Sequence, residues 1–196
     1  MKRPSVELAQ RGYDVVGLDI NEPYIALARQ LAVREGVQAT FLTGDMREIP
    51  FESHFDAVIN VGTSFGFFDS EVENHRVIKG VGRALKSRGL FLLEMANRDY
   101  YLGHFSARDW HKREDGSLIL VQREFDYASS RINTFFERLG QGEPERWSNS
   151  WRAYTLAELV LMLEQAGLRF SRVLGDWESR TYNVDSPRMV LVSEKE

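Results

Sequence analysis

Cysteine is absent from this sequence of 196 residues. The absence excludes a disulfide framework, a thiolate nucleophile and a metal site with cysteine ligands, and it fits a reducing, intracellular compartment. Long apolar runs are absent as well. No segment is long enough to span a membrane, and the N-terminal residues lack the apolar core of a secretion signal. We therefore predict a cytoplasmic protein that does not have a membrane as its partner.

A basic stripe is also missing. Acidic and basic residues are interspersed and give a formal net charge of -4, so the sequence offers no path for a phosphate backbone, and nucleic acid is not an expected partner. Four histidines show no metal-ligand spacing, and we expect no metal site at His54, His75, His104 and His111. What the chain does have is 43% hydrophobic residues, which predicts one well-buried core and a single domain.

Helix and strand patterns alternate over the first half of the chain. Helices are predicted ahead of Gly12, from Asn21 to Gly36 and from Val72 to Leu85. Strands are predicted at residues 13–18, 39–42, 55–61 and 90–95. Parallel strands that are covered on both faces are continuously apolar, as residues 90–93 are, so we expect an α/β fold with a mostly parallel sheet.

From about Gly103 the pattern changes. Three alternating segments, residues 119–125, 132–139 and 146–154, predict an antiparallel β-meander that is inserted into the α/β domain over one edge or the mouth of its sheet. We place this insert at residues 104–154 of a single domain, residues 1–196. Thr155 and Glu158 then have capping-box spacing ahead of a helix, and residues 168–174 and 189–192 predict a closing pair of antiparallel strands.

Polar residues stand where the predicted parallel strands end. Asp19-Ile20, Asp45-Met46 and Asn60-Val61-Gly62 follow three of the apolar runs. Ligands of open α/β sheets bind beyond these carboxyl ends, and an ionised carboxylate accepts two donors at once. The order of side chains suits a ligand with a ribose, an adenine and a charged tail. Asp19 alone is equally consistent with a residue that only caps the next helix.

The chain resembles the class I S-adenosylmethionine-dependent methyltransferases over nearly its whole length. The resemblance lies in the acidic end of residues 15–19, in Gly44-Asp45-Met46, in residues 55–60 and 85–93, and in the closing strand pair. It implies a Rossmann-like, doubly wound sheet. It also implies that Asp19 binds both ribose hydroxyls, that Ile20 packs on the adenine and that Asp45 and Met46 read its edge, whereas Asn60, Val61 and Gly62 lie beneath the methionine portion.

The family has a first strand and a glycine-rich turn ahead of the helix that begins here near Ser5, and this sequence starts after both. Because that strand is the central one, we expect the strands at Val15 and Phe55 either to pair directly or to leave a gap of about 10 Å. Weak cofactor binding, or none, is expected for this polypeptide alone. A start codon placed too far downstream, a fragment and a partner chain that fills the slot are the three explanations.

The predicted activity is transfer of a methyl group from S-adenosylmethionine to a small-molecule acceptor by direct displacement. Alignment supplies much of such catalysis, so no dedicated catalytic residue is predicted. If a base is needed, Glu94, His104, Tyr101 and Tyr182 are the titratable candidates. Trp147 and Trp151 on the insert either cover the acceptor as a lid or pack the meander onto the sheet. The candidate acceptor-binding residues are Phe65, Arg98, Tyr101, His104, Arg123, Trp151, Tyr182 and Arg188.

The sequence is compatible with two other functions. A methyltransferase-like module that binds without catalysing is one, and a nicotinamide-dependent dehydrogenase, which also needs an acid after its second strand, is the other. The antiparallel final pair and Gly44-Asp45-Met46 argue against the dehydrogenase. A homodimer is compatible with the sequence.

Overall fold

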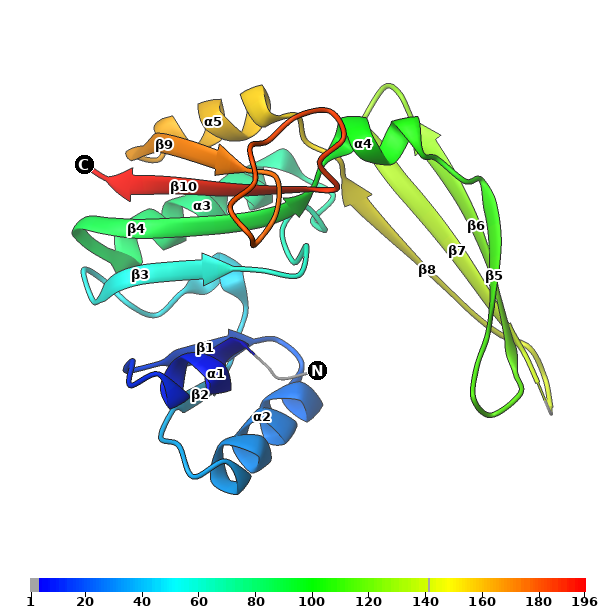
Figure 1. Ribbon diagram of the computed structural model, residues 1–196, viewed down its shortest axis with the longest axis horizontal. Helices are drawn as coiled ribbons and strands as arrows, with labels where there is room; N and C mark the ends of the chain where they lie inside the picture. Colours follow the sequence, from blue (N-terminus) through cyan, green and yellow to red (C-terminus); the bar gives the residue numbers. More distant parts are fainter. Residues whose placement is uncertain (1–3, 141) are drawn as a thin grey trace. The chain divides into compact units, whose positions relative to one another are not determined.

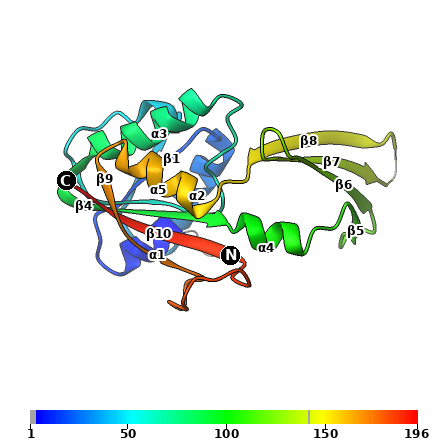
Figure 2. The same cartoon turned by 90° about the horizontal axis from the view of Figure 1, so that it is seen from above.

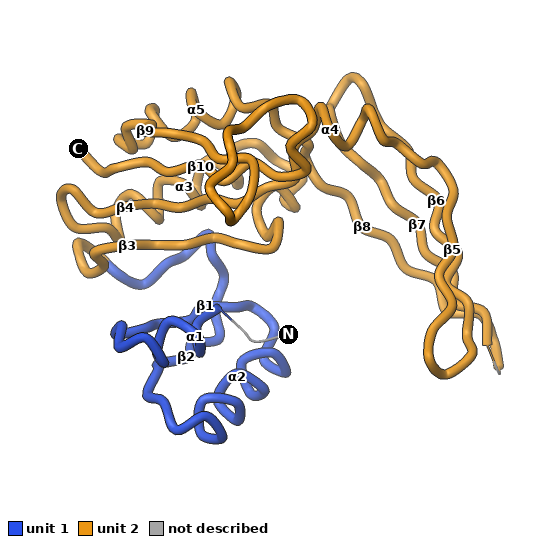
Figure 3. The backbone as a smooth tube through the Cα atoms, viewed as in Figure 1, with its two compact units in different colours: residues 1–51 blue, residues 52–196 orange. Residues whose placement is uncertain are grey.

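The computed structural model describes residues 4–140 and 142–196, and it divides the chain into two compact units, Met1–Phe51 and Glu52–Glu196 (Figure 3). Unit one contains α1 (Pro4–Gln10), β1 (Val16–Asp19), α2 (Glu22–Arg34), β2 (Thr40–Thr43) and the short 3-10 helix η1 (Met46–Glu48). Strands β1 and β2 pair in parallel, and the predicted cap of α2 is confirmed, because the Asn21 side chain accepts a hydrogen bond from the Tyr24 N–H at 3.0 Å.

A small apolar core joins the helices of unit one to β2. It consists of Val6, Ile25, Ala28, Ala32 and Phe41. A glycine at position 17 lets the strand approach this core closely, since a Cβ there would lie 2.9 Å from the Phe41 ring.

Unit two holds the main sheet. Its elements are β3 (Phe55–Asn60), α3 (Glu71–Ala84), β4 (Leu85–Ala96), α5 (Leu156–Glu164), β9 (Leu168–Leu174) and β10 (Arg188–Lys195). The strand order is β3-β4-β10-β9, with β3 parallel to β4 and β10 antiparallel to both of its neighbours. Helices α3 and α5 cover the same face of this sheet (Figure 2). The predicted antiparallel final pair and the Thr155–Glu158 capping box are confirmed.

The inserted region departs from the prediction in its strand count. The short helix α4 (Arg98–Gly103) leads into four antiparallel strands, β5 (Arg108–Lys112), β6 (Leu118–Asp126), β7 (Arg131–Leu139) and β8 (Glu145–Arg152), which pair in sequence order (Figure 1). The expectation of three strands was wrong because all five residues of β5 are exposed, so the segment has no apolar alternation to reveal it. Strand β4 is also longer than predicted and follows α3 directly at Leu85.

Strands β1 and β3 each lie at the margin of a sheet. Within the described residues, β1 hydrogen-bonds to β2 alone and β3 to β4 alone, so each keeps one edge of backbone groups outside any ladder. In the same part of the chain, no helix is long and apolar enough to cross a membrane.

The turn between β5 and β6 carries a pH-dependent contact. Hydrogen bonds from Ser117 and the nearby Arg138 guanidinium, at 2.7 Å, lower the pKa of Asp115 to about 2 from 3.8. Because the folded-state pKa is depressed, this contribution to stability is present above about pH 4 and is lost as the pH falls toward 2. We expect Asp115→Asn to flatten the acid-dependent part of thermal unfolding between pH 4 and 2, and an unchanged pH profile would contradict this assignment.

Candidate functional site

The turn after β3 contains two consecutive residues with positive φ, a backbone conformation that most residues rarely adopt. Gly62 and Thr63 both have positive φ, 78° and 55°, in the left-handed region that favours glycine. The carboxylate of Glu94 on β4 accepts a hydrogen bond from the Gly62 N–H at 2.7 Å, and Glu94 is only 5% exposed. A buried carboxylate therefore fixes the turn at the carboxyl end of the parallel strands.

Arg188, at the start of β10, completes this corner. Its guanidinium forms an ion pair with Glu94 at 3.1 Å and donates to the Thr63 hydroxyl at 3.3 Å. Both oxygens of Glu94 are thus occupied, one by the Gly62 N–H and the other by Arg188. We assign Glu94 to positioning, not to proton transfer.

A cavity of about 470 Å³ lies beside this corner, wholly within unit two. Pockets of this size take small molecules. The turn after β3, helix α4, the insert strands β6–β8 and the start of β10 all contribute to its wall. The lining residues are Gly62, Thr63, Phe67, Ala96, Tyr100, Tyr101, Arg123, Thr134, Phe136, Asn149, Trp151, Pro187 and Arg188.

The insert presents one face of its sheet to the cavity. Arg123 on β6 stands opposite Thr134 on β7, which stands opposite Asn149 on β8, so the three side chains share a face. Trp151, two residues beyond Asn149, meets the Tyr101 ring edge-on at 5.5 Å between ring centres. Polar donors and aromatic rings therefore line the same wall.

Burial raises the pKa of the Tyr101 hydroxyl above its ordinary value, although the Arg123 cation acts in the opposite direction. The phenol consequently stays protonated at neutral pH and serves as a hydrogen-bond donor. A phenol in this state is a weak general base, so Tyr101 suits binding better than proton abstraction.

Asn97 ties the loop before β10 to the start of α4. It is 1% exposed, and its amide nitrogen donates to the Ser186 carbonyl at 2.8 Å and to the Asn183 carbonyl at 3.2 Å. Its side-chain oxygen accepts from the Asp99 N–H at 3.1 Å and from the Tyr182 hydroxyl at 3.1 Å. These hydrogen bonds of Asn97 fix the loop that precedes Pro187 and Arg188, two residues of the cavity wall.

Four of the predicted acceptor-binding residues line the cavity. They are Tyr101, Arg123, Trp151 and Arg188, and the predicted cofactor residue Gly62 is there as well. Asn60 ends β3, and the Val61 carbonyl accepts from the Ser64 hydroxyl at 3.0 Å, so both belong to the strand and turn that carry Gly62.

The other four predicted residues lie elsewhere in unit two. Phe65 is fully buried and stacks on Tyr154, with 5.6 Å between ring centres, so it belongs to the core. Arg98 begins α4 and pairs with Asp99. His104 stacks on Tyr100 at the end of α4, and Tyr182 donates to Asn97.

The predicted adenosine-binding residues lie in unit one. One oxygen of Asp19 accepts from the Asn21 N–H at 2.8 Å, and among the described residues the second oxygen has no hydrogen-bond donor. Ile20 beside it is 70% exposed. Asp45 caps η1, which begins at Met46, and pairs with Arg47, so its carboxylate is already engaged.

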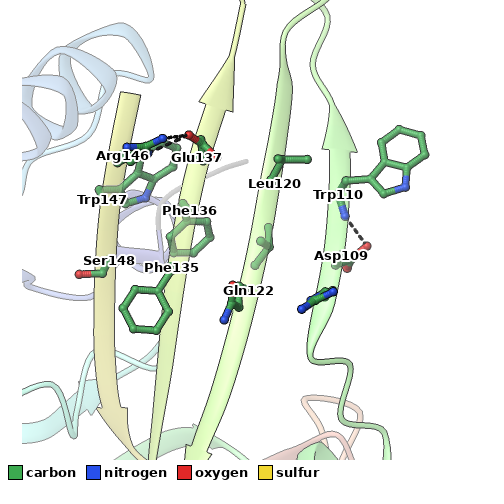
Figure 4. A pocket seen from close by; sticks show the side chains of 12 residues that line it. Asp109, Trp110, Leu120, Gln122, Phe135, Phe136, Glu137, Arg146, Trp147 and Ser148 are labelled. Carbon is green, nitrogen blue, oxygen red and sulfur yellow. Dashed lines mark hydrogen bonds and ion pairs between the residues drawn. The ribbon is translucent and has the colours of Figure 1, made fainter. Parts of the chain in front are cut away.

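A larger hollow of about 710 Å³ lies on the insert sheet alone (Figure 4). Trp110, Phe135 and Trp147 are among its lining residues, and Arg146 pairs with Glu137 at its wall. No residue from β3, β4 or β10 lines it. We therefore place the chemistry in the smaller cavity, which includes the ends of those strands.

Comparison with known proteins identifies methyltransferases as similar to this chain. Residues 3–89 match the model of a family described as a methyltransferase domain. The cypemycin N-terminal methyltransferase of a Streptomyces species is 26% identical over 194 residues, covering 98% of this chain and 78% of the relative. Glycine/sarcosine N-methyltransferase of Aphanothece halophytica is 28% identical over 189 residues, covering 93% of this chain and 68% of the relative.

Among solved structures, the CcbJ methyltransferase from Streptomyces caelestis superimposes with a TM-score of 0.84 at 19% identity, covering 98% of this chain and 84% of that one. The likeness confirms the Rossmann-like methyltransferase fold. The chain is thus similar to S-adenosylmethionine-dependent methyltransferases over nearly its whole length, and the family match itself covers residues 3–89. The predictions of a methyltransferase and of S-adenosylmethionine as its methyl donor are confirmed, and the prediction of a dehydrogenase is not.

Sequence reasoning missed several of the cavity residues. Thr134, Phe136 and Asn149 reach it through cross-strand register, and Tyr100 reaches it through a helix of only six residues. The alternation of Phe136 with Thr134 was the available signal, because residues two apart on a strand share a face. Phe67 and Thr63, in the segment after β3, also line the wall.

Proposed function

We propose that this enzyme methylates a small-molecule acceptor that binds in the cavity of about 470 Å³ in unit two. The observation that carries the proposal is the cavity itself, which combines the Gly62–Thr63 turn with aromatic and donor side chains of the insert. The glycine/sarcosine relative acts on small molecules, which supports an acceptor of this class. We further propose that residues 1–196 work as one domain, in which residues 104–154 supply the acceptor's wall.

The residues of unit one fit the adenosine part of the donor. Asp19 keeps one carboxylate oxygen available for ribose hydroxyls, and the exposed Ile20 side chain offers an apolar surface for the adenine. Asp45 and Met46 would contact the edge of the adenine. Asp45 would do so with a carboxylate that also forms an ion pair with Arg47.

S-adenosylmethionine, when bound, supplies a methyl group on a sulfonium that is already an activated leaving group. The acceptor's lone pair forms the new bond to the methyl carbon as the carbon–sulfur bond breaks, and that electron pair stays on sulfur. The acceptor's proton, where it has one, leaves to water. This chain contributes mainly the alignment of the acceptor against the Gly62–Thr63 turn, which Glu94 and Arg188 hold in place.

Two measurements test the proposed function. Calorimetry should detect binding of S-adenosylhomocysteine, weak for this polypeptide alone, and no binding of a nicotinamide dinucleotide. A radiolabelled methyl group from the donor should then enter the low-molecular-mass fraction of a cell extract. Label that enters only protein or nucleic acid would contradict a small-molecule acceptor.

Asp19→Asn should weaken S-adenosylhomocysteine binding about tenfold, because an amide loses the charge that strengthens its bonds to the ribose hydroxyls. The amide oxygen still accepts from the Asn21 N–H, so the start of α2 should stay intact. Asp14→Asn is the matched control, since Asp14 is an exposed acid of the same unit. Equal affinities of the two variants, by calorimetry, would remove Asp19 from the cofactor site.

A further inference from the structure

The guanidinium of Arg123 lies at the wall of the acceptor cavity with a side chain that is 20% exposed. Its Nη1 donates to the Ser106 carbonyl at 3.2 Å, and its Nη2 lies 3.8 Å from the Asp109 carboxylate, beyond hydrogen-bond distance. A guanidinium carries five N–H donors. Within residues 4–140 and 142–196, most of the Arg123 donors are therefore available to a ligand.

Arg123 has a more distant counter-ion than the other cation of the cavity, because the Asp109 carboxylate lies 3.8 Å from its guanidinium. Arg188, the other cation of the wall, has the Glu94 carboxylate at 3.1 Å. The described lining residues include no Asp or Glu. A partly buried cation whose ion-pair partner lies beyond hydrogen-bond distance still has donors for an anion, and the planar guanidinium fits a carboxylate with two parallel hydrogen bonds.

The neighbours of Arg123 extend this donor surface. Thr134 and Asn149 lie beside it on the same face of the insert sheet, and the Tyr101 hydroxyl stays protonated because burial raises its pKa. Next to these groups, Trp151 and Phe136 provide aromatic surface. The wall thus pairs a site for an anionic head with a site for an apolar body.

We propose that Arg123 holds a carboxylate of the methyl acceptor, so that the acceptor is a small carboxylic acid whose apolar body packs on Trp151 and Phe136. The inference rests on the proposed function and narrows its substrate class. Arg123 contacts the acceptor away from the reacting atoms, and the acceptor's nucleophile points to the Gly62–Thr63 turn.

The test compares carboxylic acids with the amides in which an uncharged group replaces the carboxylate, on the natural protein and in the presence of S-adenosylhomocysteine. The probe pairs are glycine and glycinamide, L-phenylalanine and L-phenylalaninamide, and phenylacetate and phenylacetamide. Ligand-observed NMR titration gives the affinities. We expect at least one acid to bind about 10- to 100-fold more tightly than its amide, as a charge-assisted carboxylate contact requires. Equal affinities in every pair, or no binding by any acid, would overturn the proposal.

Variants locate the contact. Arg123→Gln should remove the preference for the acid and leave the affinity of the amide unchanged, and Tyr101→Phe should reduce the preference a few-fold while preserving the ring contact with Trp151. Arg146→Gln is the matched control, because Arg146 lies on the same sheet, is 76% exposed and does not line this cavity. A preference for the acid that survives Arg123→Gln would place the carboxylate elsewhere.

The two proposals fail in different ways. Loss of S-adenosylhomocysteine binding by the natural protein would contradict the methyltransferase function itself. Normal S-adenosylhomocysteine binding with methyl transfer to neutral or cationic small molecules alone would leave that function standing and overturn the carboxylate assignment.

Discussion

Replacing Arg152 by alanine should lower the free energy of unfolding by about 3 kcal/mol. Arg152 ends β8 with a side chain that is 15% exposed, and its guanidinium lies 2.6 Å from a carboxylate oxygen of Glu158 and 3.1 Å from one of Glu71. It also lies 4.9 Å from the ring centre of Tyr154, whose hydroxyl donates to Glu71 at 2.7 Å. Alanine would leave two acids without the cation that separates them.

The magnitude follows from the exposure of the partners. Removing one member of a buried ion pair costs about 3–5 kcal/mol, and the lower end applies because Glu71 is 46% and Glu158 39% exposed. Urea unfolding followed by circular dichroism measures the loss. Arg146→Ala, on the same strand but with a side chain that is 76% exposed, should change stability by less than about 0.5 kcal/mol. Similar losses in both variants would refute a special role for Arg152.

The position of Arg152 explains why this contact matters to the site. Its partners Glu71 and Glu158 lie in the first turns of α3 and α5, and its backbone N–H donates to the Gly66 carbonyl at 2.8 Å. The residue therefore joins the base of the insert to both helices that cover the main sheet and to the loop after β3. The insert supplies one wall of the cavity. The contacts of Arg152 therefore help to fix the position of that wall.

Local signals explain which parts of the fold could be predicted. Asn21 and Thr155 cap their helices as the sequence indicates, because the cap and its N–H partner are only three residues apart. The apolar run at residues 90–93 predicts a strand for a similar reason, and within it Phe91 and Leu93 are buried whereas Leu90 is 46% exposed. The class of fold and the carboxyl-end residues follow from these signals.

Other features depend on tertiary register that no local pattern encodes. Strand β5 is held by its ladder with β6 and has no apolar face of its own, so its residues alone predict a loop. Thr134 and Asn149 enter the cavity because each stands opposite a neighbour from a distant segment, in a pairing fixed by turns outside the site. Phe65 is the opposite case, a predicted site residue that the structure places in the core. Thr63 and Phe67 on either side of it line the cavity, whereas the Phe65 ring is fully buried.

Removing the Glu94 carboxylate should loosen the corner of the site. Glu94→Ala leaves the Gly62 N–H without its acceptor and Arg188 without its counter-ion, and we expect the free energy of unfolding to fall by about 2–3 kcal/mol. A larger loss is not expected, because the Arg188 side chain is 44% exposed and reaches water when the carboxylate is gone. Hydrogen exchange at the Gly62 amide should accelerate together with the loss of stability.

Glu94→Gln separates the two contacts, because its amide oxygen still accepts from Gly62 but no longer balances Arg188. It should cost about 1 kcal/mol and leave exchange at the Gly62 amide slow. A double-mutant cycle with Arg188→Gln should give a coupling energy of about 1 kcal/mol, because the buried Glu94 carboxylate contacts a guanidinium that is 44% exposed and therefore screened by water. A coupling near zero, with Gln and Ala equally harmful, would mean that Glu94 acts through its volume and not through these bonds. The corner would then owe its shape to packing, and the Gly62–Thr63 turn to its own backbone preferences.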